Sequence, residues 1–414
     1  APTEVRTYEA GHLGEVIREA PIAQIVSAIL EQAMRLRASD VHIEPQLGDT
    51  RVRYRIDGIL QERLALPRRL QDAVISRIKI LADMKIDEKR IPQDGRFNFK
   101  MGSDEVDLRV STLPTVHGEK VVMRLLKKSG GIPTMPELGL RGLALKNLET
   151  SIARPHGIIL VTGPTGSGKT TTLYAVLAKL NNARVNIMTL EDPVEYQIAG
   201  VNQVQVNPAA GLTFATGLRS FLRQDPNIIL VGEIRDNETT ELAIQAALTG
   251  HLVFSTLHTN NAAGAIPRLL DLGAEPFLVA SALNSVVGQR IARRVCATCR
   301  EEYDPEAAVV ADIKNILGDL LPKDKPIKLY RGKGTVSGQA CTNCSGSGYH
   351  GRMGIFEVFP VSDAISKLVL TRTPMKDIEN QAIAEGMITM KQDGYLKVLD
   401  GITTLEEVLR VAQD

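Results

Sequence analysis

The chain has 414 residues, more than one ordinary hydrophobic core holds, so two or three domains are predicted. Its 43% hydrophobic and 23% charged residues are typical of a soluble globular protein, and a net charge of +1 excludes a general attraction to nucleic acid or to an anionic membrane. No apolar run approaches the roughly 18 residues that span a bilayer, and the start has no signal-peptide pattern, which favours a cytoplasmic setting.

The first part of the chain predicts a tether and a small α+β domain. The chain starts at Ala1 rather than Met, so we expect a processed protein or a piece of a longer one, and residues 1–20 are polar and tether-like. Apolar residues at helical spacing predict helices at 21–37 and 70–84. Alternating runs predict strands, and Asp57-Gly58 predicts a tight turn after the second of them; the strands are 41–43, 51–56, 106–110 and 120–126. Residues 21–126 are expected to form a PAS-like N-terminal domain.

The middle of the chain predicts an α/β domain. Paired glycines and two prolines make residues 127–138 the best candidate for a linker. Strands then alternate with helices, which predicts a largely parallel, doubly wound sheet over residues 139–295. The predicted strands are 157–162, 186–189, 227–231 and 252–256, and the predicted helices begin at Gly168, Phe214 and Thr239. Residues 296–357 hold the cysteines and are expected to form a zinc subdomain, and residues 358–414 a helical region.

A phosphate-binding loop lies between the first strand and the first helix of this domain. The pattern G-x-x-x-x-G-K-[ST] is filled at every fixed position by Gly163, Pro164, Thr165, Gly166, Ser167, Gly168, Lys169 and Thr170, and Thr171 follows. Glycines let backbone N–H groups turn towards phosphates, Lys169 can reach the β- and γ-phosphates of ATP, and the Thr170 hydroxyl is placed for Mg²⁺. A chance match is the alternative, but the strand before the loop and the helix after it are what the motif requires.

Two acidic clusters and one histidine follow predicted strands of the same domain. Glu191 lies in "TLEDPVEY" and Glu233 in "NIILVGEIRD", and a P-loop enzyme needs carboxylates to hold the metal and orient water. An ordinary Walker B motif has Asp where Gly232 stands, and either cluster alone could be a solvated strand end. His258 follows strand 252–256, where open sheets bind ligands, although a lone histidine is as often structural.

Taken together, these blocks resemble the type II secretion and type IV pilus assembly ATPases from about residue 21 to the end. The blocks occur in the order of that family: "SDVHIEP", "RYRIDG", "PQDGR", "RVSTLPTVHGEKVVMRLL", the P-loop, "EDPVEY", "LRQDPNIILVGEIRD" and "STLHTN". The resemblance implies a RecA-like core with a Walker A loop, an acidic box at 191–195, a Walker B motif of the Gly232-Glu233 form and a His box around His251 and His258. It implies that Glu191 or Glu233 orients the attacking water; we expect Glu191 to be catalytic and Glu233 to lie on the magnesium side.

The resemblance also implies a hexamer that holds ATP between the N-terminal domain and the RecA-like domain. Arg109 and Arg124 are then expected to reach across to the γ-phosphate, because phosphoryl transfer needs positive charge on the transferring group. The alternative is that these two arginines are residues of a solvated sheet face. Candidates of lower rank for the interface or the nucleotide are Arg219, Arg223 and Arg235.

Four cysteines form two C-x₂-C pairs that are 41 residues apart, namely Cys296, Cys299, Cys341 and Cys344. Four thiolates in two such pairs can close tetrahedrally around Zn²⁺, which would be structural because no ligand position stays open. A redox pair or unbound thiols are the alternatives. Within the family resembled, assembly and secretion ATPases usually carry this tetracysteine and retraction ATPases lack it.

The resemblance implies an ATP-driven motor that acts on an inner-membrane platform protein to assemble a pilus or a secretion pseudopilus. Such a protein is expected in the cytoplasm, at the inner membrane through its partners, with ATP, Mg²⁺ and structural Zn²⁺ bound. A nucleic-acid translocase is one rival, but 4% aromatic residues and a near-neutral charge do not favour a single-strand channel, so no nucleic acid is expected. The other rival is a nucleotide-sensing scaffold that does not hydrolyse ATP; the set Lys169, Thr170, Glu191 and Glu233 argues against it.

Overall fold

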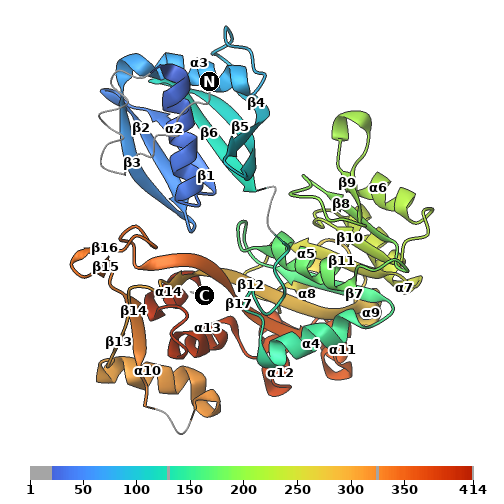
Figure 1. Cartoon of the computed structure of the whole chain (residues 1–414). Coiled ribbons are helices and arrows are strands. Elements are labelled where there is room, and N and C mark those ends of the chain that lie inside the picture. The colour runs from blue at the N-terminus through green and yellow to red at the C-terminus, as the bar shows by residue number, and fades with distance from the viewer. Residues whose placement is uncertain (1–20, 128–130, 323–325, 413–414) are drawn as a thin grey trace. The chain divides into compact units, whose positions relative to one another are not determined.

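The structure, a computed structural model, describes residues 21–127, 131–322 and 326–412 (Figure 1). It divides into unit 1, Ala1–Gly131, and unit 2, Ile132–Asp414. The tether expected at 1–20 lies outside the described residues. Among the described residues, every helix is too short or too polar to cross a membrane.

Unit 1 is a six-stranded sheet in which every neighbouring pair of strands is antiparallel. The strand order is β3-β2-β1-β6-β5-β4. The strands are β1 Asp40–Pro45, β2 Asp49–Ile56, β3 Ile59–Pro67, β4 Gln93–Met101, β5 Asp104–Thr115 and β6 Gly118–Lys127. Two helices, α2 Ile22–Arg35 and α3 Gln71–Leu81, pack against it, the second after a 3₁₀ turn, η1 Arg68–Leu70. The α+β character expected for this part of the chain is therefore present.

Alternation along the strands of unit 1 separates an apolar face from a charged one. Apolar side chains such as Val41 and Ile43 are fully buried in the core with both helices, whereas Arg residues of β2 stay half-exposed. The predicted turn is confirmed, since Asp57 and Gly58 have φ of 47° and 87° between the paired residues of β2 and β3. The helix predicted at 70–84 is too long at its end, because Asp83 takes a positive φ of 57° two residues after α3 stops.

Unit 2 is built on a seven-stranded sheet in the order β17-β12-β7-β11-β10-β8-β9. All neighbouring pairs are parallel except β12 with β17. The strands are β7 Gly157–Thr162, β8 Ile187–Glu191, β9 Asn202–Gln205, β10 Ile228–Val231, β11 Leu252–Leu257, β12 Leu283–Val295 and β17 Tyr349–Pro360. The expected α/β fold with a largely parallel sheet is confirmed.

Helices cover both faces of this sheet and bury two separate apolar clusters. One cluster contains α4 Gly142–Ile152 and α5 Lys169–Leu180. The other contains α6 Phe214–Phe221, α7 Asn237–Leu248, α8 Ala265–Asp271, α9 Pro276–Ala282, α11 Asp363–Leu370 and α12 Met375–Ala384. Met135, inside the segment expected to be a linker, is 2% exposed and packs in the first cluster. The second half of that segment is thus part of unit 2.

The last third of the chain differs most from the sequence-based expectation. Residues 349–357, expected in a zinc subdomain, lie in β17, which pairs with β12 at the edge of the main sheet. Two further helices, α13 Met390–Leu399 and α14 Leu405–Val411, pack against these two strands. Between the cysteine pairs lie β13 Arg300–Tyr303, α10 Ala307–Leu317, the 3₁₀ turn η3 Gly318–Leu320, β14 Leu329–Gly332, β15 Thr335–Val336 and β16 Gln339–Ala340. The remaining 3₁₀ turn, η2 Pro208–Ala210, precedes α6.

Candidate nucleotide site and metal centre

The phosphate-binding loop connects the carboxyl end of β7 to the amino end of α5. Gly163, Gly166 and Gly168 have positive φ of 147°, 80° and 85°, which L side chains rarely adopt. A Cβ at Gly163 would also lie 2.5 Å from Ser167 Oγ, so this position has no room for a side chain. Backbone N–H groups at the start of α5 therefore stand at the edge of the sheet where ligands of parallel α/β folds bind.

Lys169 begins α5 and folds back over the loop. Its Nζ donates to Gly163 O at 2.7 Å and to Pro164 O at 3.1 Å, and the residue is 9% exposed. Burial lowers the pKa of Lys169 below its ordinary value of 10.5, while the nearby carboxylate of Glu233 raises it. Burial destabilises the charged form of Lys169, and Glu233 offsets this only in part. Binding of a phosphate anion would therefore stabilise the charge further.

The rest of the loop fits a bound triphosphate. Pro164, Thr165 and Gly166 are exposed, and Thr170 and Thr171 are half-buried. Ser167 Oγ is buried and has no hydrogen-bond partner among the described residues. A buried hydroxyl of this kind is costly unless a further group pairs with it. The residues that would hold the triphosphate and its Mg²⁺ are thus those of the motif, with the Thr170 hydroxyl available to the metal.

Glu191, at the end of β8, is held in a closed hydrogen-bond network. The residue is 3% exposed, and its carboxylate accepts from the hydroxyl groups of Tyr174 and Thr189 and from Gln203 Nε2. Gln203 also donates to Tyr196 O at 3.1 Å. Three donors occupy the carboxylate, so Glu191 fixes the end of β8 and its oxygens face protein rather than an open site.

Glu233, two residues beyond β10, is close enough to the P-loop lysine for its charge to raise the pKa of Lys169. Its side chain is 13% exposed and forms an ion pair with Arg235 Nη2 at 2.5 Å. His258 Nε2, just beyond β11, is 3.6 Å from Glu233 Oε2. Burial and then the positive charge of Lys169 lower the pKa of His258 below 6.5, against the opposing effect of Glu233. The site therefore brings together a carboxyl group, an amine and an imidazole whose neutral form is favoured.

His251 does not join His258. It precedes β11, at the opposite end of that strand, where its Nδ1 is 2.8 Å from Ala246 O. Arg219 pairs with Glu238, and Arg223 donates to Arg219 O at 3.0 Å. Only Arg235, of the three arginines given lower rank, contacts a proposed site residue.

Arg109 and Arg124 lie in unit 1 and are direct cross-strand partners. Arg109 of β5 faces Arg124 of β6, which faces Asp40 of β1. Opposed residues of paired strands share one face of a sheet. Arg124 Nε donates to Asp40 Oδ1 at 3.0 Å, and its side chain is 60% exposed. The two arginines thus form one cationic pair that Asp40 orients from one side.

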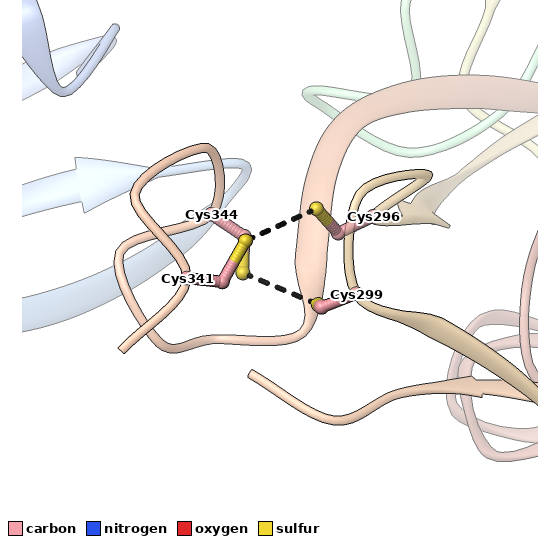
Figure 2. Close-up of side chains that lie close together, drawn as sticks. All are labelled: Cys296, Cys299, Cys341 and Cys344. Carbon is pink, nitrogen blue, oxygen red and sulfur yellow. Dashed lines mark hydrogen bonds between the residues drawn. The ribbon is translucent and has the colours of Figure 1, made fainter. Parts of the chain in front are cut away.

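The four cysteine side chains come together in a buried cluster (Figure 2). All four sulfur atoms lie within 4.8 Å of one another. Cys296 Sγ is 3.9 Å from Cys341 Sγ, and Cys299 Sγ is 3.7 Å from Cys344 Sγ, so no disulfide joins the four cysteines. Tetrahedral Zn–S bonds of about 2.3 Å place neighbouring sulfurs about 3.8 Å apart. Burial destabilises the thiolate of Cys299 and raises its pKa to about 12. A divalent cation among the four thiolates would remove this destabilisation.

Several residues of the site were not predicted from the sequence. Tyr174 and Gln203, which bind Glu191, and Gln289 of β12, which bonds to the back of the P-loop, are the main ones. Tyr174 and Gln289 are polar side chains among apolar residues of α5 and β12, whereas Gln203 lies in the mostly polar strand β9. Their partners, however, lie 12 to 122 residues away in the chain, and no local pattern shows them.

A P-loop at the carboxyl edge of a mostly parallel sheet, with acidic residues after the neighbouring strands, defines a P-loop nucleotide hydrolase. A family model described as "Type II/IV secretion system protein" matches residues 15–410. The chain belongs to that family and is one of its P-loop ATPases.

Among curated relatives, the type IV pilus assembly ATPase PilB of Myxococcus xanthus is 47% identical over 98% of this chain and 70% of its own length. The type II secretion system ATPase E of Vibrio cholerae is 47% identical over 96% of this chain and 76% of its own length. The crystal structure of the pilus retraction motor PilT with bound ADP matches with a TM-score of 0.60 and 27% identity, over 94% of this chain and 97% of PilT. The Legionella pneumophila ATPase DotB matches in fold, with a TM-score of 0.67 and 19% identity over 95% of this chain and 98% of DotB.

Proposed function

We propose that this chain is a subunit of a hexameric ATPase motor that powers assembly of a type IV pilus or a type II secretion pseudopilus. The observation that carries the proposal is the placement of Lys169, Glu233 and His258 around the P-loop of a chain whose relatives include pilus assembly and secretion ATPases. The cysteine cluster supports assembly or secretion over retraction, because retraction motors of the resembled family lack it.

The chemistry of the site supports Glu233 as the general base for hydrolysis of ATP. In this proposal Glu233 accepts the proton of the attacking water, because its partly exposed carboxylate lies near Lys169, whereas Glu191 is occupied by three donors. This reverses the roles expected from the sequence, and Glu191 becomes a residue that holds the end of β8. Mg²⁺, when bound at Thr170, would neutralise charge on the phosphates.

Two further groups complete the proposed site. Arg109 and Arg124 would neutralise the charge that develops on the γ-phosphate when the N-terminal domain closes on the RecA-like domain. Residues 127–138 would contain the joint, and the division expected from the sequence remains a proposal except at residues 349–357, which belong to the main sheet. The four cysteines would hold one structural Zn²⁺.

The proposed partner is an inner-membrane platform protein, so the motor would work in the cytoplasm at that membrane through its partner. The test measures Mg-ATP hydrolysis by the purified chain alone, with DNA, and with the cytoplasmic domains of platform proteins from pilus and secretion systems. Binding to one platform domain with a rise in turnover supports the proposal and identifies the system. Stimulation by DNA instead would refute it in favour of a translocase, and binding of ATP without any turnover would favour a nucleotide-sensing scaffold.

A further inference from the structure

The buried side chain of Gln289 forms hydrogen bonds with the P-loop and with the helix that follows it. Gln289 lies in the middle of β12, is 3% exposed, and its Nε2 donates to Ser167 O at 2.7 Å. Its Oε1 accepts from Thr172 Oγ1 in the first turn of α5 at 2.8 Å. A backbone carbonyl can only accept a hydrogen bond, so the amide has one orientation in which both bonds form.

This contact determines which way one peptide of the loop points. In a trans peptide the C=O and the following N–H point in opposite directions. Because Ser167 C=O is bonded to β12 behind the loop, the N–H of Gly168 points away from β12. Pro164, Thr165 and Gly166 of the same loop are exposed and open to a ligand.

The Ser167–Gly168 peptide needs this hydrogen bond because the residues around it offer little resistance to rotation of the peptide plane. Gly166 and Gly168 stand on either side of Ser167, and glycine accepts both signs of φ at little cost. A reversed Ser167–Gly168 peptide would present a carbonyl oxygen, rather than an N–H, to an anion. The amide of Gln289 makes the reversed form costly, because Ser167 O would leave its buried donor.

We propose that Gln289 is a positioning residue for nucleotide binding, which holds the Ser167–Gly168 peptide with its N–H directed at the phosphates. The inference rests on the proposed nucleotide site and deepens it. Gln289 acts on the phosphates only through the loop, and Thr172 keeps the Gln289 amide in the required orientation. The predicted effect is on the affinity for any nucleotide that carries a β-phosphate, so ADP and ATP are affected alike.

The test compares two amide-to-leucine variants on the same strand. Asn284 is the matched control, because it is also a buried amide of β12 that bridges unit 2, with Nδ2 donating to His156 O at 2.7 Å and Oδ1 accepting from Arg154 at 3.1 Å. Its partners lie at the start of β7, away from the P-loop. Gln289→Leu should raise the Kd of ADP and of Mg-ATP by about tenfold, equivalent to about 1.4 kcal/mol, and Asn284→Leu by less than about twofold, in the full chain measured with fluorescent nucleotides.

The changes in KM and kcat distinguish a role of Gln289 in positioning the loop from general damage to the fold. Loss of binding shared by substrate and transition state raises KM more than it lowers kcat, so most of the change in kcat/KM for Gln289→Leu should be in KM. An equal rise in Kd for both leucine variants would overturn the proposal, and so would an unchanged Kd for Gln289→Leu. If Gln289→Leu does not fold, Thr172→Val decides: a rise of about threefold in Kd supports the proposal and an unchanged Kd refutes it. Failure of the wild-type chain to bind ADP would refute the nucleotide site itself, and the inference with it.

Discussion

The buried carboxylate of Glu407 should control how the stability of unit 2 responds to acid. Glu407 lies in α14, is 1% exposed, and accepts from the backbone N–H and guanidinium of Arg293 at 3.0 and 2.6 Å. Arg410 donates to the same carboxylate at 2.9 and 2.7 Å. Burial alone would raise the pKa of Glu407, but these donors outweigh it and lower the pKa from 4.5 to about 2.

A lowered folded-state pKa means that ionised Glu407 stabilises the fold above its ordinary pKa and that this contribution is lost as pH falls from 4.5 towards 2. Each pH unit by which a pKa is lowered is worth about 1.4 kcal/mol, which gives a contribution of about 3 kcal/mol at pH 7 and about 2 kcal/mol at pH 3.5. Glu407→Gln removes the ionised form, so it should lower the free energy of unfolding by these amounts.

The assay is urea denaturation followed by circular dichroism, because the chain has no Trp for fluorescence. The control is Glu406→Gln, which removes a neighbouring but exposed carboxylate and should change the free energy of unfolding by less than about 0.5 kcal/mol. An equal midpoint for wild type and Glu407→Gln at pH 7 would refute the reasoning. A gap as large at pH 3.5 as at pH 7 would show that the side chain stabilises by packing rather than by charge.

Three further predictions concern the nucleotide and metal sites. Glu233→Gln should lower kcat for ATP by about 10²- to 10⁴-fold with ADP affinity nearly kept, and an equal loss in Glu191→Gln but not in Glu233→Gln would reverse the assignment of the base. Arg109→Ala should keep nucleotide binding and lose turnover, so normal ATPase activity in this variant would exclude its role at the γ-phosphate. The purified chain should carry about one zinc and lose it in Cys341→Ser, as measured by elemental analysis; metal-free protein with four freely titratable thiols would contradict the zinc site.

The elements around the P-loop could be predicted because their signals are local. The apolar run of β7, the glycines that follow and the helix formers of α5 are contiguous in the sequence, and the alternation of the next strands and helices needs only short windows. β12 was missed for the opposite reason. Its sequence LNSVVGQRIARRV places amides and arginines among apolar residues, so neither the period of a helix nor that of a strand is continuous.

The roles proposed for the two glutamates depend on contacts that the sequence does not show. Glu191 ends β8 and Glu233 follows β10, and the preference for Glu191 as the catalytic residue comes from the family resemblance rather than from a local pattern. The difference between them depends on Tyr174 and Gln203, which reach Glu191 from a helix and from a neighbouring strand. Burial and hydrogen bonding across elements therefore separate a held carboxylate from one that can accept a proton.

The polar residues of β12 are informative because each has a distant partner. Along this one strand, Asn284 bonds to the start of β7, Gln289 to the P-loop and Arg293 to Glu407 of α14, and Cys296 of the metal cluster follows directly after its end. Thirteen residues at about 3.3 Å each give a strand about 40 Å long. Burial of a polar group is costly unless it is paired, so each of these interruptions of β12 marks a contact between elements of the fold. In β12 these contacts connect the nucleotide loop, the C-terminal helices and the cysteine cluster, which is why the residues that spoil its apolar pattern are those nearest to its function.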